Sequence, residues 1–158
     1  MDTGALNFDS EFMSLALQEA EHALSLDEVP IGAAIVKDGR VLAKDHNRRE
    51  TLYDVTAHAE MLVMRAACEQ LKNWRLMGCT IYVTMEPCPM CAGAMQQARV
   101  ARVVYGCADP KAGAAGSTLN ILDEPKLSHR LRVTRGVEEE KCRELLNIFF
   151  KRLRPAEK

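Results

Sequence analysis

Two short groups of residues have the side-chain types of a metal-dependent catalytic site. His58 and Glu60 form a His-x-Glu pair, and Cys88 and Cys91 form a Cys-x-x-Cys pair further along the chain. Imidazole and thiolate are ligands that Zn²⁺ prefers, and a catalytic zinc has three protein ligands with its fourth position left to water. We therefore expect His58, Cys88 and Cys91 to hold the metal. Glu60, beside the metal but not bound to it, would be the base that takes the proton of that water.

The spacing within each pair requires that a helix start at the site. Residues three apart lie on the same side of a helix, so Cys88 and Cys91 can bind one ion. The partial positive charge of a helix N-terminus would also favour their thiolate forms. Residues two apart, as His58 and Glu60 are, point to different sides of a regular helix. We therefore expect a helix to begin at His58, where end geometry lets both side chains reach one cavity.

The cysteines have two other interpretations besides a catalytic zinc. A closed structural zinc site needs a fourth protein ligand, and no other histidine or cysteine stands at finger-like spacing to the group. The residues available for that position are His22, His46, His129, Cys68, Cys79, Cys107 and Cys142. A thioredoxin-like redox role for Cys88 and Cys91 would leave His58 and Glu60 without a function.

Strand and helix patterns alternate along the chain and indicate how these residues are positioned. Apolar spacing predicts helices over 10–26 with Ser10 as the N-cap, over 57–71, from about residue 88 and from about residue 138. Short apolar runs predict a hairpin over 31–43 and strands at 81–85 and 103–105. The polar stretch 46–56 and the glycine-rich stretch 112–117 are expected to be loops. This order favours an α/β fold with a sheet of about five strands and helices on both faces.

Length and composition limit the classes of protein to consider. A chain of 158 residues is the size of one domain, which we expect to span residues 1–158. Its 47% hydrophobic and 27% charged residues are typical of a globular protein, and no apolar run or export signal predicts membrane insertion or secretion. The six cysteines are therefore not expected to form a disulfide framework. The net charge of −1 means that any nucleic-acid site must be local.

Longer stretches around these motifs resemble the bacterial tRNA-specific adenosine deaminases, within the zinc-dependent cytidine and deoxycytidylate deaminase superfamily. The matching stretches are Ala57–Glu60, Tyr82–Met95, Arg102–Gly106, Gly113–Ser117 and Phe149–Phe150. The resemblance runs from about Val29 to Arg152. It implies a three-layer α/β fold of the cytidine-deaminase type, with a central five-stranded mixed sheet. It also implies one zinc ion per subunit and a cytoplasmic homodimer that hydrolytically deaminates adenosine to inosine at the wobble position of a tRNA anticodon.

The resemblance further implies a substrate-binding set. Activated water would attack C6 of the adenine while Glu60 delivers a proton to the ring nitrogen and then to the departing amine. Asn47 matches the family's base-contacting asparagine, and its other interpretation is a turn residue. The base must be splayed out of the anticodon stem-loop, so nearby groups have to hold the flanking nucleotides. Family positions near the bound loop correspond to Asp109, Lys111, Phe149 and Arg152. Core packing is an equal alternative for at least one of the two adjacent phenylalanines.

Three positions depart from the family pattern and bear on substrate fit rather than on the metal motif. Val55 stands where a proline is common, His46 where some members have an aromatic residue, and Cys107 where alanine is frequent. Two functional alternatives stay open: a zinc-dependent deaminase of a free base or nucleoside of the guanine or cytosine type, and a zinc-stabilised RNA-binding module without catalysis. The Glu86-Pro87 dipeptide, the glycine-rich loop and the basic, aromatic C-terminus favour the tRNA enzyme.

Overall fold

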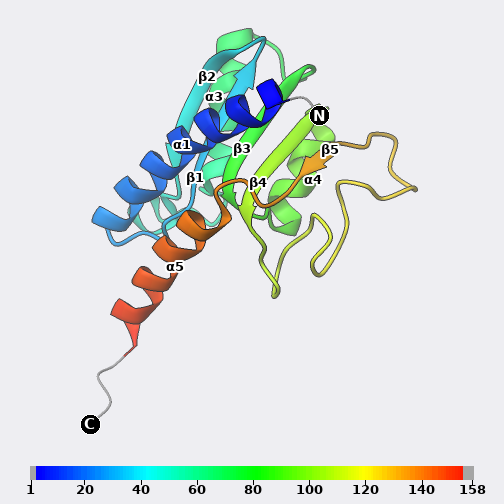
Figure 1. The fold of residues 1–158 in the computed structure, drawn as a ribbon. Coiled ribbons are helices and arrows are strands. Elements are labelled where there is room, and N and C mark those ends of the chain that lie inside the picture. Colours follow the sequence, from blue (N-terminus) through cyan, green and yellow to red (C-terminus); the bar gives the residue numbers. More distant parts are fainter. Residues whose placement is uncertain (1–2, 155–158) are drawn as a thin grey trace.

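A single mixed sheet lies between two layers of helices in the computed structural model, which describes residues 3–154 (Figure 1). The domain expected over residues 1–158 therefore includes two ends, 1–2 and 155–158, that lie outside the described residues. The strands are β1 (Gly32–Lys37), β2 (Arg40–His46), β3 (Cys79–Met85), β4 (Arg102–Cys107) and β5 (Arg132–Thr134). The helices are α1 (Thr3–Ser25), α2 (Arg49–Leu52), α3 (Ala59–Leu71), α4 (Pro89–Gln97) and α5 (Glu139–Leu153).

The strand directions bring several chain segments to one edge of the sheet. The strand order is β2-β1-β3-β4-β5; β1 pairs antiparallel with β2 and β3, whereas β3–β4 and β4–β5 are parallel. The carboxyl ends of β2, β3 and β4 and the amino end of β1 therefore share an edge. Ligand sites of α/β folds form in the loops at such an edge. Asn47 and Glu86 come directly after β2 and β3, Asp109 follows β4 by two residues, and the three side chains gather there.

Each face of the sheet is covered by its own pair of helices. Helices α3 and α4 pack on one face, while α1 and α5 pack on the other (Figure 1). Side chains of a strand alternate between its faces. In β3, Ile81 and Val83 accordingly lie in the core under α3 and α4, while Tyr82 packs among residues of α1 and α5. The three-layer arrangement with a mixed five-stranded sheet confirms the predicted fold class. None of the helices in residues 3–154 is long and apolar enough to cross a membrane.

Three details differ from the sequence-based expectation. Ser10 is not an N-cap, because α1 already runs from Thr3 and Asp9 anchors it to the sheet through hydrogen bonds from Tyr82 (3.0 Å) and Arg102 (2.6 and 2.9 Å). The stretch 46–56 is not all loop: His46 ends β2, and α2 follows. Strand β5 was not predicted individually, since its three residues are too few to show a period.

Candidate active site

The helix that carries Glu60 begins at the position that the His-x-Glu spacing requires. Helix α3 starts at Ala59, and His58 precedes it in an extended conformation with φ −74° and ψ 150°. Because His58 lies outside the helix and Glu60 lies in its first turn, both side chains line the same pocket. The expected helix start is thereby confirmed.

The two cysteines occupy the start of helix α4. Cys88 precedes the helix in an extended conformation with φ −76° and ψ 172°, and Pro89 is the first helical residue. Proline suits this position because its missing N–H would have no partner inside the helix. Cys91 then lies in the first turn, so both sulfurs sit at the positive end of the α4 dipole.

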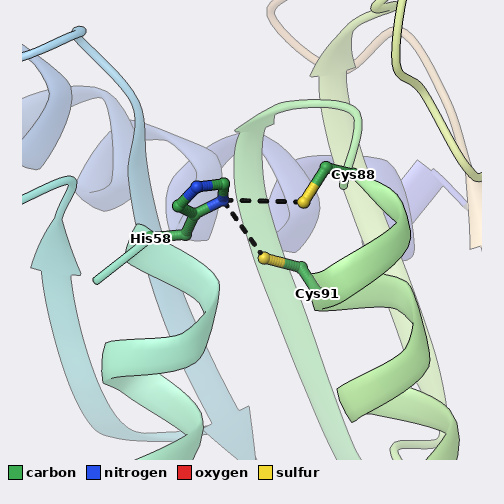
Figure 2. Close-up of side chains that lie close together, drawn as sticks. All are labelled: His58, Cys88 and Cys91. Atoms are coloured by element: carbon green, nitrogen blue, oxygen red, sulfur yellow. Dashed lines mark hydrogen bonds between the residues drawn. The ribbon is translucent and has the colours of Figure 1, made fainter. Parts of the chain in front are cut away.

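His58, Cys88 and Cys91 converge from the starts of the two helices (Figure 2). Nδ1 of His58 lies 3.6 Å from Sγ of Cys88 and 3.5 Å from Sγ of Cys91. A tetrahedral zinc with ordinary Zn–N and Zn–S bond lengths separates its nitrogen and sulfur ligands by about 3.6 Å. The donor atoms are therefore already at the spacing that such an ion requires. Within residues 3–154 this group has three members, so no fourth protein ligand closes the site.

The protonation of the three side chains also suits metal binding. A hydrogen bond from the Cys91 thiol lowers the pKa of Cys88 to about 4, with His58 acting in the same direction. The same interaction with Cys88, together with burial, raises the pKa of Cys91, and the bond to Cys88 raises the pKa of His58. The lowered pKa of Cys88 favours its thiolate, which is the form that binds a metal ion, and binding would release the proton of Cys91.

Glu60 lies beside this group without belonging to it. Its side chain is only 4% exposed, and burial raises the pKa of its carboxyl group. Together with His58 and Cys88 it lines a pocket that encloses about 500 Å³, counting its open mouth, a size that accommodates a small organic group. The other lining residues are Val29, Ile31, Asn47, Arg49, Ala59, Met85, Glu86 and Asp109. A carboxyl group with a raised pKa in such a pocket is suited to accepting and returning a proton.

Asn47 reaches this pocket from the end of β2. It is 5% exposed, and its backbone N–H donates to the carbonyl of Ile31 (3.0 Å). Its side-chain Oδ1 accepts the backbone N–H of Arg49 (3.2 Å), which leaves the Nδ2 group as the donor available to a ligand. Asn47 thus has the turn role that the sequence allowed and a place in the pocket. Arg49, which also lines the pocket, was not singled out from the sequence, because an arginine in a polar stretch carries no distinctive signal.

Glu86 lines the pocket and organises the glycine-rich loop behind it. Its carboxylate, 3% exposed, accepts backbone N–H groups from Asp109 (3.3 Å), Ala115 (3.0 Å) and Ser117 (3.2 Å), and also the Ser117 hydroxyl. Gly113 must lack a side chain, since a Cβ there would lie 2.5 Å from the carbonyl oxygen of Asp109. The sequence drew attention to the Glu86-Pro87 dipeptide but not to this role, because the donors come from a distant segment.

The outer residues predicted to hold RNA are only partly brought together. Lys111 lines an open groove with residues at the end of α5, namely Asn147, Phe150, Lys151, Leu153 and Arg154. The end of α5 projects away from the sheet (Figure 1). Phe149 is 7% exposed, whereas Phe150 is 47% exposed, so Phe150 has the more accessible ring. Arg152 is exposed but is not among the groove residues, and Asp109 lines the inner pocket, where its Oδ1 accepts the N–H of Lys111 (3.0 Å).

Comparisons with known proteins place this arrangement in a family. The family described as MafB19-like deaminase matches residues 7–154. The tRNA-specific adenosine deaminase of Bacillus subtilis is 49% identical over 150 residues, which cover 95% of this chain and 93% of that protein. The tRNA-specific adenosine deaminase of Aquifex aeolicus is 48% identical over 90% of this chain and 94% of its own length.

Solved structures agree with the sequence comparison. A structure from a study of A-to-I editing by tRNA:A34 deaminases at the wobble position of transfer RNA superposes with a TM-score of 0.84 and 50% identity. That match covers 86% of this chain and 99% of the other. The guanine deaminase of Nitrosomonas europaea superposes with a TM-score of 0.77 over 89% of this chain and 83% of its own length, and at 22% identity it shares the fold.

Proposed function

Because the chain belongs to the family of tRNA-specific adenosine deaminases, we propose that its pocket converts adenosine to inosine at the wobble position of a tRNA. The observation that carries this function is the arrangement of three metal-ligand candidates at tetrahedral spacing with a buried, uncoordinated carboxyl group beside them. We also propose that residues 1–158 form one deaminase domain, which the family match over residues 7–154 supports.

His58, Cys88 and Cys91 would hold one Zn²⁺ per chain. Their chemistry supports zinc over Mg²⁺ or Ca²⁺, because imidazole and thiolate are softer donors than the oxygen ligands that those ions prefer. When bound, the ion would supply an activated water at neutral pH. Since the protein contributes three ligands, the site would keep one position open toward the pocket.

Glu60 would move the protons of the reaction. Addition of water across the C6–N1 bond of adenine requires a proton at N1, and loss of the amine requires a second proton on the departing nitrogen. A single carboxyl group that takes both protons from water can deliver them in turn, so the products are inosine and ammonia. Burial of Glu60 supports this role because a raised carboxyl pKa eases protonation.

Asn47 would orient the base. Its Oδ1 is engaged by the N–H of Arg49, so its Nδ2 can donate a hydrogen bond to an acceptor nitrogen on the purine edge. A pocket donor that matches an acceptor on the correct base discriminates against bases that lack it, since the donor would then be left unpaired.

We propose that the anticodon stem-loop lies along the groove between Lys111 and the end of α5. Lysine and arginine groups there can neutralise phosphates, and the exposed ring of Phe150 can stack on an unpaired base. The buried ring of Phe149 would hold the ring of Phe150 in place through an edge-to-face contact, since their ring centroids lie 5.4 Å apart. Asp109 would act by shaping the turn that presents Lys111, and Arg152 would add charge beside the groove.

A homodimer and a cytoplasmic location complete the proposal. Exposed apolar side chains gather on one short segment, where Leu52 is 50%, Tyr53 97% and Val55 72% exposed. Such a surface supports a subunit contact. Sedimentation velocity would test the dimer, and a monomer at micromolar concentration would contradict it. The cytoplasmic location rests on the family's tRNA substrate.

Inosine formation tests the reaction directly. The purified protein is incubated with an anticodon stem-loop that carries adenosine at the wobble position, and separately with free adenine, guanine and cytosine. We expect inosine at that one position and no ammonia from the free bases. Release of ammonia from free bases alone would replace this function with that of a free-base deaminase.

Variants of α3 separate catalysis from simple RNA binding. Glu60→Ala should keep the metal and the fold but form no inosine, whereas Glu69→Ala, an exposed position on the same helix, should behave like the unaltered protein. Cys88→Ala should lose the metal and part of the stability. Full activity in Glu60→Ala would contradict the proposed role of Glu60.

A further inference from the structure

Two histidines that could have completed a closed zinc site lie elsewhere, close to each other. His22 comes from α1 and His46 from the end of β2, and their ring centroids are 4.9 Å apart. Glu19 lies one helical turn before His22 on α1. One ligand atom from each of Glu19, His22 and His46 lies within 4.8 Å of the other two. The three side chains thus form a second cluster of metal-ligating groups.

The fold places this cluster on the face of the sheet opposite the candidate active site. His46 pairs directly with Gly32 across β1 and β2, so the two residues face the same side, which is the side covered by α1. Gly32 has no side chain where α1 crosses it: a Cβ there would lie 2.6 Å from the backbone N of Ala20 and 2.9 Å from Cβ of Glu19. This close approach brings Glu19 and His22 within reach of His46.

The protonation of His46 leaves one ring nitrogen free to bind a ligand. Nδ1 of His46 lies 2.9 Å from the carbonyl oxygen of Asn47, and a carbonyl oxygen can only accept, so Nδ1 carries the proton. In the neutral ring, Nε2 then has an available lone pair. His46 is fully buried, and in residues 3–154 its Nε2 is the one buried side-chain nitrogen or oxygen without a hydrogen-bond partner.

A buried lone pair without a partner is costly, and the groups around it indicate what would satisfy it. Metal-ligating histidines usually donate their other ring N–H to a carbonyl or carboxylate, as His46 does to Asn47. Two imidazoles and one carboxylate are a ligand set for Zn²⁺ and neighbouring divalent transition metals rather than for Mg²⁺ or Ca²⁺.

We propose that Glu19, His22 and His46 form a second binding site for a divalent transition-metal ion, separate from the group at His58. An ion there connects α1 to the end of β2. It also fixes the His46 ring, whose Nδ1–H holds the carbonyl of Asn47 at the wall of the pocket. Occupancy of this site therefore stabilises the strand end that carries Asn47. The site stands on its own geometry and does not depend on the proposed reaction.

Cobalt titration tests the second site, because cobalt bound there gives d–d bands without the charge-transfer bands that thiolate ligands add. Tag-free, metal-free protein is given one equivalent of Zn²⁺, which the softer two-thiolate group takes first, and is then titrated with Co²⁺ and followed by absorption. Cobalt on nitrogen and oxygen ligands gives d–d bands, whereas cobalt on thiolates adds intense sulfur-to-metal charge-transfer bands. We expect d–d bands that saturate at one further equivalent of metal, without the charge-transfer bands.

Two of the three variants lie on the exposed side of α1, where a substitution does not endanger folding. His22→Ala should weaken cobalt binding by at least about tenfold, because it removes a ligand. Glu21→Ala, the adjacent exposed position, is the matched control and should titrate like the unaltered protein. His46→Phe, which keeps an aromatic ring in the buried space, should abolish the bands.

Two results would overturn the proposal: no d–d bands up to millimolar Co²⁺ in the unaltered protein, or identical titrations of that protein and His22→Ala. A failure of the first metal site is recognised separately, since it alone changes the charge-transfer bands. When metal-free protein is titrated with Co²⁺ without prior zinc, the charge-transfer bands should appear in the unaltered protein and be absent in Cys88→Ala, while the d–d bands of the second site remain in both.

Discussion

Replacing Glu86 by glutamine tests whether its carboxylate holds the glycine-rich loop at the pocket. Oε2 accepts the backbone N–H groups of Ala115 and Ser117, and Oε1 accepts that of Asp109 and the Ser117 hydroxyl. The new NH₂ group can stand at only one of these positions. It does least harm at Oε1, where the hydroxyl can turn to accept and one backbone donor, Asp109 N–H, loses its partner.

The loss in free energy of the closed loop can be worked out from those hydrogen bonds. An unpaired, partly buried donor costs about 1–3 kcal/mol, and loss of the negative charge weakens each remaining bond, for a total of about 2–4 kcal/mol. This is less than the stability of an ordinary domain, so the variant should still fold. Loop opening should become roughly 30- to 1,000-fold more frequent.

Amide hydrogen exchange measures this change at the residues concerned. Exchange of the Ala115 and Ser117 amides should accelerate by that factor in Glu86→Gln, while amides in the centre of β3 change little. Glu69→Gln, an exposed position on α3, is the control for loss of one charge. Acceleration below about threefold at both loop amides would show that the carboxylate is not what holds the loop, and the reasoning from Glu86 would fail.

Three further predictions concern the metal, the thiols and the buried phenol. Removal of the metal by a chelator should lower the melting temperature and stop inosine formation, and stoichiometric Zn²⁺ should restore both; unchanged activity at zero measured zinc would contradict a metal-dependent site. In metal-free protein at pH 8, iodoacetamide should modify Cys88, whose pKa is lowered to about 4, well before Cys107 and Cys142, because burial raises the pKa of these two to about 11 and about 12. Mass spectrometry after digestion gives the order, and equal rates would refute it. Burial raises the pKa of Tyr82, so above pH 10 the unfolded chain releases this proton while the folded chain keeps it, and stability should fall by up to about 1.4 kcal/mol per pH unit. Urea unfolding of Tyr82→Phe should lack this part of the decline, and an unchanged slope would exclude Tyr82 as its source.

Local rules were sufficient where the residues of a feature lie close together in the chain. The His-x-Glu spacing required a helix start, and α3 does begin at Ala59. Pro87, directly before the Cys-x-x-Cys pair, likewise predicted a helix start at about Cys88, and α4 begins at Pro89. Both results depend on backbone geometry over three or four residues, which nearby sequence determines. The alternation of apolar strands and helices similarly predicted the three-layer fold. The roles of Glu60 and Asn47 in the reaction stay predictions.

Features built from distant segments could not be predicted in this way. Residue type alone indicated neither that Glu86 binds the loop at 113–117 nor that Asp9 anchors the start of α1.

The two adjacent phenylalanines show the same limit, since only packing decided that Phe149 is buried and Phe150 exposed. His22 and His46 make the point most clearly. Nothing in their spacing relates them, and they meet because Gly32 lets α1 lie directly on the sheet.

The sequence by itself determined the local chemistry at two helix starts and the layer order, because these depend on neighbouring residues and on periodicity. Only the tertiary structure decided which distant side chains meet, because that depends on strand order and on how closely the helices approach the sheet.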